Sequence, residues 1–432
     1  MYTNTLRNFD KKTLKVKKAE GIYLYNNNRK ILDTTAGATS FAVLGWNNKK
    51  INKAILNQLI KFSHIDYKVW EDPNITKLSK ILLSKAAHNL NKVYYCGNSG
   101  AEANEAAMKL SYLTHQSNGF FKKKYFIGRT QSYHGMSSDV LSISERPNLK
   151  IYKEFYSKSR SLIPQHHYLN EKKKNETKEE YAIRSASYLE KEIIKIGPEN
   201  VSAFIGETIM GGLIGDVCPV GNYWQLIRKI CNKYNVHLIL DECYCGLGSS
   251  GKIYCCDYDK ITPDFITVAK CLTAGYAPLS AVITKSKFEK QIKKKFGSIL
   301  HSTTNQGHSL GVAAALEVQK IIHSDKILNN INLMGNYMRN TLVDSLKGHN
   351  FFRDVRGRGL RFSFEYNCKN QNEFGQEVSQ NMLEKYNIYT DGKWHRFHFT
   401  PAFIIKKKEC DMILESLIKE FILVSKKKKY QK

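Results

Sequence analysis

Three side chains able to do chemistry each follow a short apolar segment of the chain. Asp241 follows residues 236–240, Lys270 follows residues 265–269, and Ser99 comes shortly after a third such segment. A serine in a Ser-Gly-Ala turn before a helix offers a hydroxyl and free backbone N–H groups, which suit a phosphate. A carboxylate at the end of a buried strand needs a partner. A lysine at such a place fits an amine that bonds to an aldehyde.

Each residue alone also has a simpler structural interpretation. Ser99 and Asp241 are acceptable caps for the elements that follow them, and Lys270 can extend its ammonium group to the sheet edge. Together they favour a single site, because open α/β sheets bind ligands at the carboxyl ends of their strands. A phosphate cradle, a carboxylate for a pyridinium nitrogen and an amine for an aldehyde are what pyridoxal 5'-phosphate (PLP) requires.

The elements that must position these residues alternate between strands and helices. Continuous apolar strands separated by helices indicate a parallel sheet that is covered on both faces. After about residue 310, two long helices and shorter elements indicate a second, α+β region. Residues 167–197 are predicted to be a polar, helical surface segment. The predicted strands are 93–96, 124–127, 201–205, 236–240, 265–269 and 281–283, and the predicted helices are 48–62, 74–87, 98–115, 222–234, 310–323 and 326–346.

The motifs in combination resemble class III (subgroup II) PLP-dependent aminotransferases, within them the omega-aminotransferases. They include Asn98-Ser99-Gly100-Ala101-Glu102, Ser132-Tyr133-His134-Gly135, Leu240-Asp241-Glu242, Ala269-Lys270 and Val355-Arg356-Gly357-Arg358-Gly359. The resemblance implies an α/β fold of type I, with a mostly parallel seven-stranded sheet and a smaller α+β domain from both chain ends. We expect residues 1–60 to begin the small domain, 61–310 to form the PLP domain and 311–432 to complete the small domain.

The resemblance also implies a role for each residue of the site. Lys270 is the Schiff-base lysine and Asp241 the partner of the pyridine nitrogen. The remaining expected cofactor contacts are Ser99, Gly100 and Ala101 at the phosphate, Tyr133 stacked on the ring with His134 beside it, Glu207 as an acid near the cofactor, Cys243 packed on the ring, and Thr304 at the phosphate of the neighbouring subunit. The role of Thr304 implies a homodimer.

Some positions depart from the family pattern. Cys243 stands where a valine usually packs on the ring, Thr208 replaces a proline, and Ser249 replaces an arginine. Cysteine behaves as a small apolar side chain, so packing on the ring should survive. A glutamate-1-semialdehyde-type aminomutase uses the same cofactor site, but its usual Gly-Gly-Gly-Met-Pro stretch is absent after Lys270. A catalytically inactive relative stays open as an alternative.

Arg396 and Trp70 are the candidate substrate-binding residues. Arg396 lies just before the segment that starts at Thr400. Near this segment the family often has an arginine that binds the carboxylate of the oxo acid that accepts the amino group. Its two-pronged guanidinium suits a carboxylate, and it could swing aside for donors without one. Arg396 is equally well explained as a surface arginine on a strand, in which case another cation, such as Arg129 or Arg146, would bind the carboxylate. Trp70 is expected either to line the same pocket or to lie in the core.

The composition and the motifs argue against several other classes of protein. The net charge is +28, from 67 Lys and Arg against 39 Asp and Glu. The lysines occur in runs apart from the aromatic residues, so we expect solvated surface and no nucleic-acid partner. No apolar run is long enough to cross a bilayer, and the first residues do not resemble a secretory signal. The ten cysteines lack zinc-site spacing, so we expect free thiols, no metal and a cytoplasmic protein. No G-x-G-x-x-G motif supports a Rossmann dehydrogenase.

Overall fold

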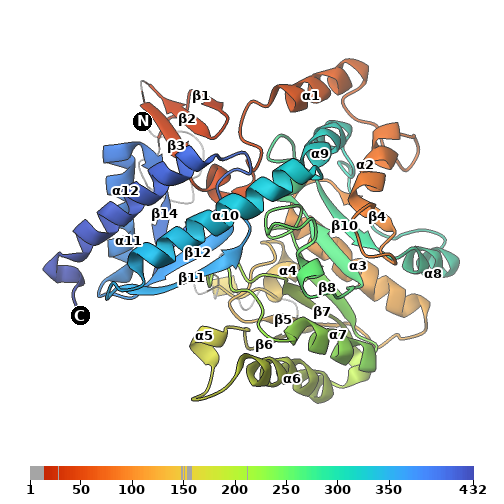
Figure 1. Cartoon of the computed structure of the whole chain (residues 1–432). Helices are drawn as coiled ribbons and strands as arrows, with labels where there is room; N and C mark the ends of the chain where they lie inside the picture. The colour runs from red at the N-terminus through yellow and green to blue at the C-terminus, as the bar shows by residue number, and fades with distance from the viewer. Residues whose placement is uncertain (1–13, 28, 147–148, 150, 153–157, 212) are drawn as a thin grey trace.

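The structure is a computed structural model that describes residues 14–432, except 28, 147–148, 150, 153–157 and 212. Within these residues, a sheet with the strand order β4-β10-β9-β8-β7-β5-β6 forms the centre (Figure 1). Strand β10 is antiparallel to β4 and β9, and the other neighbouring strands are parallel, as predicted. The strands are β4 (Lys92–Cys96), β5 (Tyr125–Arg129), β6 (Arg160–Ile163), β7 (Val201–Glu207), β8 (His237–Asp241), β9 (Phe265–Val268) and β10 (Ser280–Thr284).

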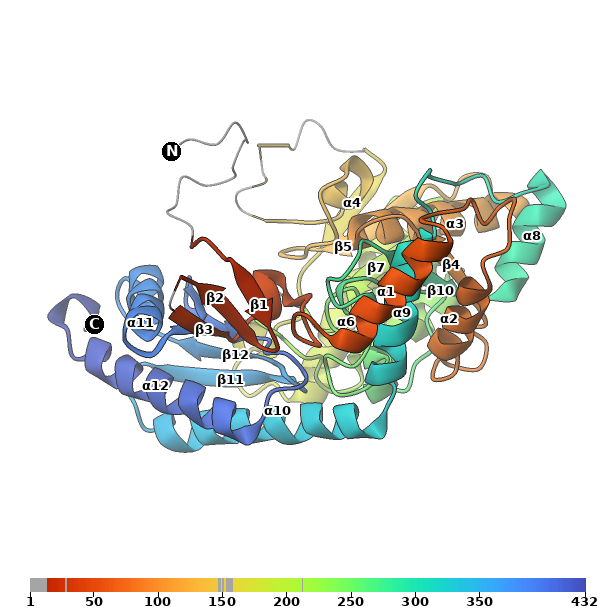
Figure 2. The ribbon, with the colours of Figure 1, turned by 90° about the horizontal axis from the view of Figure 1, so that it is seen from above.

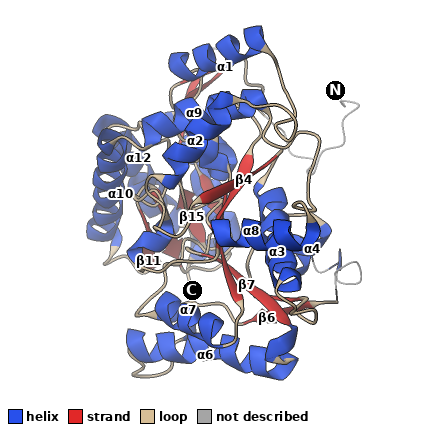
Figure 3. Ribbon diagram, turned by 90° about the vertical axis from the view of Figure 1, so that its right-hand side faces the viewer, coloured by secondary structure: helices blue, strands red, loops and turns tan. Residues whose placement is uncertain are grey.

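Helices cover both faces of this sheet. They include α2 (Pro73–Leu83), α3 (Gly100–Ser117), α4 (Ser138–Ser142), α6 (Lys178–Ile196), α7 (Tyr223–Lys233) and α8 (Ser286–Phe296). Successive side chains of a strand point to opposite faces. Accordingly, Ile239 of β8 packs in one apolar cluster with Ala103 of α3, whereas Leu238 packs in another with Trp224 of α7. Figure 3 shows α3 and α8, which contact each other, against the strands.

The segment 167–197 is helical, as predicted, but one face of its longer helix is buried. It forms α5 (Tyr168–Glu171) and α6, and α6 starts with a reciprocal capping box between Thr177 and Glu180. Tyr181 and Leu189 on one face of α6 are buried, and the helix packs against α7. Charged residues on the outer face dominate the composition of α6, so the composition of the segment alone does not indicate the buried face. Strand β6 and helix α8 were also not predicted.

The C-terminal part forms a second sheet with the order β11-β12-β15-β14. Helix α9 leads into this part and packs against α1 and α2. Figure 2 shows α10 and α12, which contact each other, along this sheet. The elements are α1 (Lys49–Lys61), α9 (Ser309–Ile322), α10 (Asp325–Leu346), β11 (Phe352–Arg358), β12 (Arg361–Tyr366), α11 (Gln371–Tyr386), β14 (Asp391–Lys393), β15 (Arg396–Phe399) and α12 (Lys407–Ser425).

A third sheet joins the two ends of the chain. Its order is β1 (Lys18–Glu20), β2 (Tyr23–Asn26), β3 (Arg29–Asp33) and β13 (Ile388–Tyr389). Strand β13 is parallel to β3, with Ile388 opposite Leu32. Residues 390 onward continue directly from β13 into β14, so this pairing fixes the start of the β14–β15 hairpin. None of the helices described is long and apolar enough for a membrane span.

Candidate active site

A cavity of about 650 Å³ lies where β7, β8 and β9 end and α3 begins. Residues from the central sheet, from the start of α3 and from the β14–β15 hairpin line it. The predicted site residues among them are Ser99, Gly100, Ala101, Tyr133, His134, Glu207, Asp241, Cys243, Lys270 and Arg396. The fold therefore brings together groups that are separated by almost 300 positions in the chain.

The start of α3 forms one wall of the cavity. Ser99 is the N-cap residue, yet its side chain makes no capping hydrogen bond, so its hydroxyl is not committed to the helix. The first N–H groups of a helix carry a partial positive charge that favours anions. A Cβ atom at Gly100 would lie 2.7 Å from Sγ of Cys243, so a larger residue would force these walls apart. The close packing thus requires glycine at position 100.

Asp241 is buried at the end of β8 and held by hydrogen bonds. Its Oδ2 atom lies 2.8 Å from Nδ1 of His134 and accepts a 2.8 Å hydrogen bond from Asn104, and its Oδ1 atom accepts one from the backbone N–H of Cys243. Burial opposes the charge of Asp241, but its hydrogen bond and charge interaction with His134 keep the pKa below its ordinary value. The carboxylate is therefore held charged in a buried place.

Two further acids follow the same sheet edge but occupy different environments. Glu207 ends β7 beside Asp241 in the parallel register and lines the cavity, and burial raises its pKa. Glu242 points away from the cavity, because it follows Asp241 directly in an extended segment. Glu242 accepts hydrogen bonds from the backbone N–H groups of Cys255 and Cys256, and burial raises its pKa to about 7.

Lys270 follows β9 in a left-handed backbone conformation, with φ of 38°. Such a value is uncommon for residues other than glycine and is often found at functional sites. The turn directs the side chain into the cavity, where its Nζ atom lies 5.3 Å from the ring centre of Tyr244. This contact places the amine against an aromatic face.

A buried network supports Tyr244 from behind. The Tyr244 hydroxyl lies 2.7 Å from Nε2 of His398, and the same nitrogen lies 3.0 Å from Oδ2 of Asp216. Arg361 forms an ion pair with Asp216 and places its guanidinium over the Tyr244 ring. Burial disfavours the Asp216 charge, but His398 and Arg361 hold the pKa of Asp216 below its usual range. The network fixes the aromatic wall beside Lys270.

The β14–β15 hairpin closes the cavity opposite the sheet. Arg396 on β15 lines it and is 1% exposed, so the alternative of a surface arginine is wrong. Of the other candidate cations, Arg146 also lines the cavity, with its guanidinium 3.8 Å from the centre of the Tyr133 ring. Arg129 is buried elsewhere and donates to the backbone carbonyl of Glu207.

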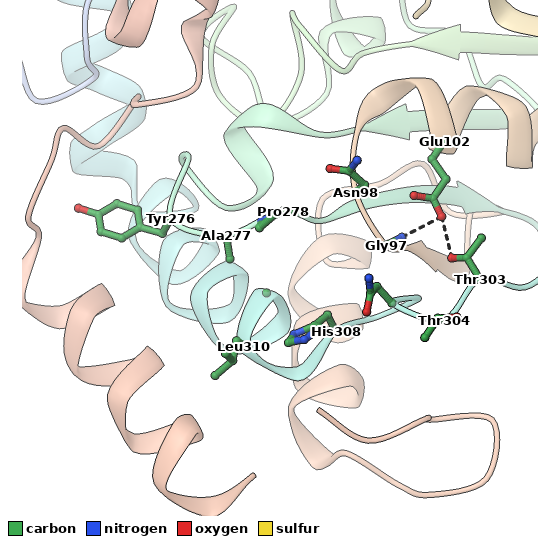
Figure 4. Close-up of a pocket in the computed structure, with 12 residues that line it drawn as sticks. Gly97, Asn98, Glu102, Tyr276, Ala277, Pro278, Thr303, Thr304, His308 and Leu310 are labelled. Carbon is green, nitrogen blue, oxygen red and sulfur yellow. Dashed lines mark hydrogen bonds between the residues drawn. The ribbon is translucent and has the colours of Figure 1, made fainter. Parts of the chain in front are cut away.

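Thr304 and Trp70 do not line this cavity within one chain. Thr304 lines a second cavity of about 640 Å³, shown in Figure 4. There Glu102 accepts hydrogen bonds from the backbone N–H of Gly97 and from the Thr303 hydroxyl. Trp70 is 65% exposed, which does not agree with its prediction as either a core residue or a residue of the first cavity. The role of Thr304 at the phosphate of a neighbouring subunit stays a prediction.

The residues of the first cavity fit PLP. The start of α3 and the uncommitted Ser99 hydroxyl suit a phosphate, and the charged, buried Asp241 suits a pyridinium nitrogen. Nε2 of His134 is buried and has no hydrogen-bond partner among the described residues, so it leaves a polar position for a ligand. Lys270 supplies the amine on the same cavity wall.

The sequence reasoning missed several residues of this site. Asn104 lies one helical turn after Gly100, and that spacing alone indicates that both face the same side of α3. Asn104 receives a hydrogen bond from Thr267 and donates to Asp241, so it orients the carboxylate. No signal in the sequence points to Tyr244 or Asp391 as cavity residues, because the fold alone brings them there.

Comparisons with known proteins identify one family for the chain. The family described as aminotransferase class-III matches residues 6–421. The chain is 34% identical to an uncharacterized aminotransferase of Schizosaccharomyces pombe, over 81% of this chain and 76% of that protein. It is 30% identical to a gamma aminobutyrate transaminase of Solanum lycopersicum, over 93% and 90% of the two chains.

Solved structures show the same fold. The omega transaminase of Pseudomonas jessenii, in complex with PMP, superposes with a TM-score of 0.90 at 27% identity and covers 96% of this chain and 93% of its own. The family match spans nearly the whole chain, and the cavity offers what the cofactor of that family requires. The chain therefore belongs to the class-III aminotransferases, which depend on PLP and transfer amino groups.

Proposed function

We propose that the enzyme moves an amino group from an amine or amino-acid donor to a small oxo acid of the pyruvate type, in two half-reactions of a ping-pong scheme. The observation that carries the proposal is the charged Asp241 at the end of β8, in one cavity with Lys270. An aminotransferase needs both groups, one to hold a proton on the pyridine nitrogen and one to move a proton at carbon.

The residues around the cofactor have distinct roles in this proposal. The phosphate is held by Ser99, Gly100 and Ala101, and the ring is packed by Tyr133 and Cys243. When bound, PLP supplies an aldehyde that reacts with amines and a ring that accepts electrons. His134 and Asn104 hold the Asp241 carboxylate in place.

Lys270 then acts as the base and acid that moves a proton. The Tyr244 ring keeps its amine on the cavity side. Burial raises the pKa of Glu207, an acid that lines the same cavity. The charge of Asp241, its neighbour on the same sheet edge, also raises the pKa of Glu207.

Arg396 is the proposed partner of the acceptor's carboxylate. Its guanidinium lines the cavity, and a planar guanidinium binds a carboxylate through two parallel hydrogen bonds. The names of the relatives support substrates of this kind, since one is a gamma aminobutyrate transaminase. Gamma aminobutyrate carries an amine at one end and a carboxylate at the other.

The proposal includes a homodimer in the cytoplasm. Thr304 lines a cavity separate from that of Lys270, which supports a role for Thr304 at the phosphate of the neighbouring subunit. In a symmetric dimer, one such patch serves both sites.

Reduction of the holoenzyme with borohydride, followed by peptide mapping, tests the proposal. We expect the pyridoxyl group on Lys270 and no turnover in Lys270→Ala. Lys252→Ala is the control, because Lys252 lies outside the cavity and donates to the backbone carbonyl of Asp257. Label on another lysine, or turnover that persists in Lys270→Ala, would contradict the proposal.

A further inference from the structure

Lysine side chains form a stripe along the outer side of α8. Lys287, Lys290 and Lys294 are exposed, and their spacing of three and four residues places them on one side of the helix. Phe288 and Ile292 on the other side are buried. Figures 1 and 2 show α8 at the outer edge of the molecule, next to α3. The stripe therefore faces away from the sheet.

Neither ion pairing nor helix stability accounts for this stripe. Glu289 is the acid of α8, and it pairs with Lys92 and Lys293 instead. Among the described residues, the three lysines of the stripe have no acidic partner. Lys287 also lies in the first turn of α8, where the helix dipole disfavours a positive charge. The stripe thus presents uncompensated positive charge to solvent.

Two exposed phenylalanines lie beside the stripe. Phe120 and Phe121 follow α3, and their side chains are 46% and 66% exposed. Nε2 of Gln291 on α8 donates a 2.9 Å hydrogen bond to Oδ1 of Asn118, which holds the loop of residues 118–122 against α8. The fold therefore brings aromatic side chains and lysines onto one face, which differs from the sequence-based expectation of lysine runs apart from aromatic residues.

A buried lysine anchors the loop that carries these rings. Lys123 is 3% exposed, and its ammonium group donates to three backbone carbonyls, those of Pro198, Val201 and Tyr234. At the other end of the loop, the backbone N–H of Phe120 donates to the carbonyl of His115. The loop thus holds both rings outward, and a loop that is already ordered loses little conformational entropy on binding.

We propose that this face docks the enzyme on an anionic membrane surface. Its lysines bind acidic lipid head groups, and its two phenyl rings enter the boundary between head groups and acyl chains. Basic and apolar groups together are what interfacial membrane binding requires, and no span of the bilayer is involved. The docking face consists of Phe120, Phe121, Lys122, Lys287, Lys290 and Lys294.

The composition of the docking face favours lipid over nucleic acid as its partner. All of its cations are lysines, whereas arginine is the residue that binds bases and phosphates through two parallel hydrogen bonds. A lysine places its charge among head groups while its aliphatic stem stays in the apolar boundary. Phenyl rings have no polar group to keep in water, so they gain free energy when they enter the bilayer.

The docking face leaves the cofactor cavity free. Helix α3 has 18 residues and runs from Gly100 at the cavity to Ser117 beside the docking face. At 1.5 Å per residue, the helix spans about 27 Å. The inference therefore concerns where the enzyme works and goes beyond the proposed reaction. Variants of the docking face should keep the rate of amino transfer.

Flotation of the holoenzyme with lipid vesicles tests the proposal. Vesicles of phosphatidylcholine and phosphatidylserine in a two-to-one ratio are compared with vesicles of phosphatidylcholine alone, at about 0.1 M salt. We expect the enzyme to bind the mixed vesicles and not the neutral ones. Binding should weaken as salt is added, because salt screens the attraction between the lysines and the head groups.

Variants of the lysines and of the phenylalanines should weaken binding in different ways. The triple variant Lys287→Gln, Lys290→Gln and Lys294→Gln should lower the partition coefficient about 100-fold and flatten its salt dependence, since each lysine near an anionic surface contributes about fivefold. Phe120→Ser combined with Phe121→Ser should lower it at least about tenfold at every salt concentration, because the lost contribution is hydrophobic.

The matched control is the triple variant Lys172→Gln, Lys173→Gln and Lys174→Gln, which removes the same charge from exposed lysines between α5 and α6. It should leave binding nearly unchanged. Thermal unfolding and the rate of amino transfer, measured for each variant, should match the wild type and show that the variants are folded.

Three outcomes would overturn the inference. Equal losses in the two triple lysine variants would show that net charge alone drives binding. Absence of binding to the mixed vesicles would exclude a lipid partner. Binding of single-stranded polyuridine, lost in the variants of the docking face while the vesicles are not bound, would assign the face to nucleic acid. None of these outcomes bears on amino transfer, which is measured separately.

Discussion

His134 and Asp241 form a buried pair, with Nδ1 of His134 2.8 Å from Oδ2 of Asp241. His134 comes from the loop after β5 and Asp241 from the end of β8. The histidine thus fixes one carboxylate oxygen, while the backbone N–H of Cys243 fixes the other. The pair keeps the carboxylate charged and oriented, which a partner for a pyridinium nitrogen requires.

Replacement of Asp241 by asparagine tests this pair. Asp241→Asn keeps the shape of the side chain but removes the charge that holds the pyridinium proton. We expect the rate to fall by about 10²–10⁴, which corresponds to several kcal/mol of transition-state stabilisation. Stopped-flow absorbance of the half-reaction measures this rate, and a near-normal value would show that the nitrogen is held in another way.

Arg396 should affect the two substrates differently. Arg396→Ala removes the proposed partner of the acceptor's carboxylate, so KM for an oxo acid should rise at least about tenfold. KM for an amine donor without a carboxylate should change much less. Steady-state kinetics with both substrates gives the comparison.

Because Arg396 is buried, its replacement also removes packing, and thermal unfolding of the variant must be measured alongside its kinetics. Arg146→Ala is the matched variant, since Arg146 also lines the cavity. Equal changes in both KM values for Arg396→Ala would assign Arg396 a structural role, and a selective effect of Arg146→Ala would identify the carboxylate partner.

Thr304 should contribute to the cofactor site of a partner subunit. We expect Thr304→Ala to weaken PLP binding and leave the fold intact, because the variant removes one hydroxyl from the phosphate. Loss of one hydrogen bond to a charged group costs about 1.5–3 kcal/mol, or roughly a tenfold to hundredfold higher Kd. Fluorescence titration of the apoenzyme measures Kd.

Sedimentation of the same samples gives the oligomeric state. The wild-type enzyme should sediment as a dimer at concentrations where it is active. Thr303→Val serves as the control for Thr304→Ala, because the Thr303 hydroxyl donates to Glu102 within its own chain. A fully active monomer would disprove the shared site.

Glu242 should make the folded enzyme less stable as pH rises through neutrality. Its pKa is raised by burial from 4.5 to about 7, so the folded state binds the proton more tightly than the unfolded chain does. Between these values the folded state holds more protons, and the free energy of unfolding therefore falls with increasing pH. The full effect is about 3 kcal/mol at most, since one pKa unit corresponds to about 1.4 kcal/mol.

Urea unfolding at several pH values, with the wild type and Glu242→Gln side by side, checks this effect. The neutral glutamine cannot ionise, so the difference in stability between the two proteins should shift in favour of the variant from pH 4.5 to 8. Glu373→Gln, at an exposed acid paired with Lys429, is the control. A pH-independent difference between wild type and Glu242→Gln would contradict the raised pKa.

The local sequence determined most of the elements and the groups expected to react at the site. Apolar runs with polar ends predict β8 and β9 as buried strands. Asp241 ends β8 and Lys270 comes shortly after β9, and both are recognisable because a polar group there interrupts the apolar pattern. The Ser-Gly-Ala turn likewise predicts a helix that starts at residue 98, two residues before the observed start of α3. These features depend on neighbours in the chain, so they can be deduced without the fold.

Tertiary structure decided the rest, because contacts between distant segments have no local pattern. The cavity wall of Asp391, Lys393, Arg396 and His398 exists only because β13 pairs with β3 and places the hairpin over the sheet edge. The sequence identified Arg396 as a candidate for substrate binding. The burial of Arg396 and the Lys393–Asp391 ion pair beside it depend on that packing. The amino-acid sequence therefore determined which groups are expected to react, and the fold determined which charged side chains face those groups.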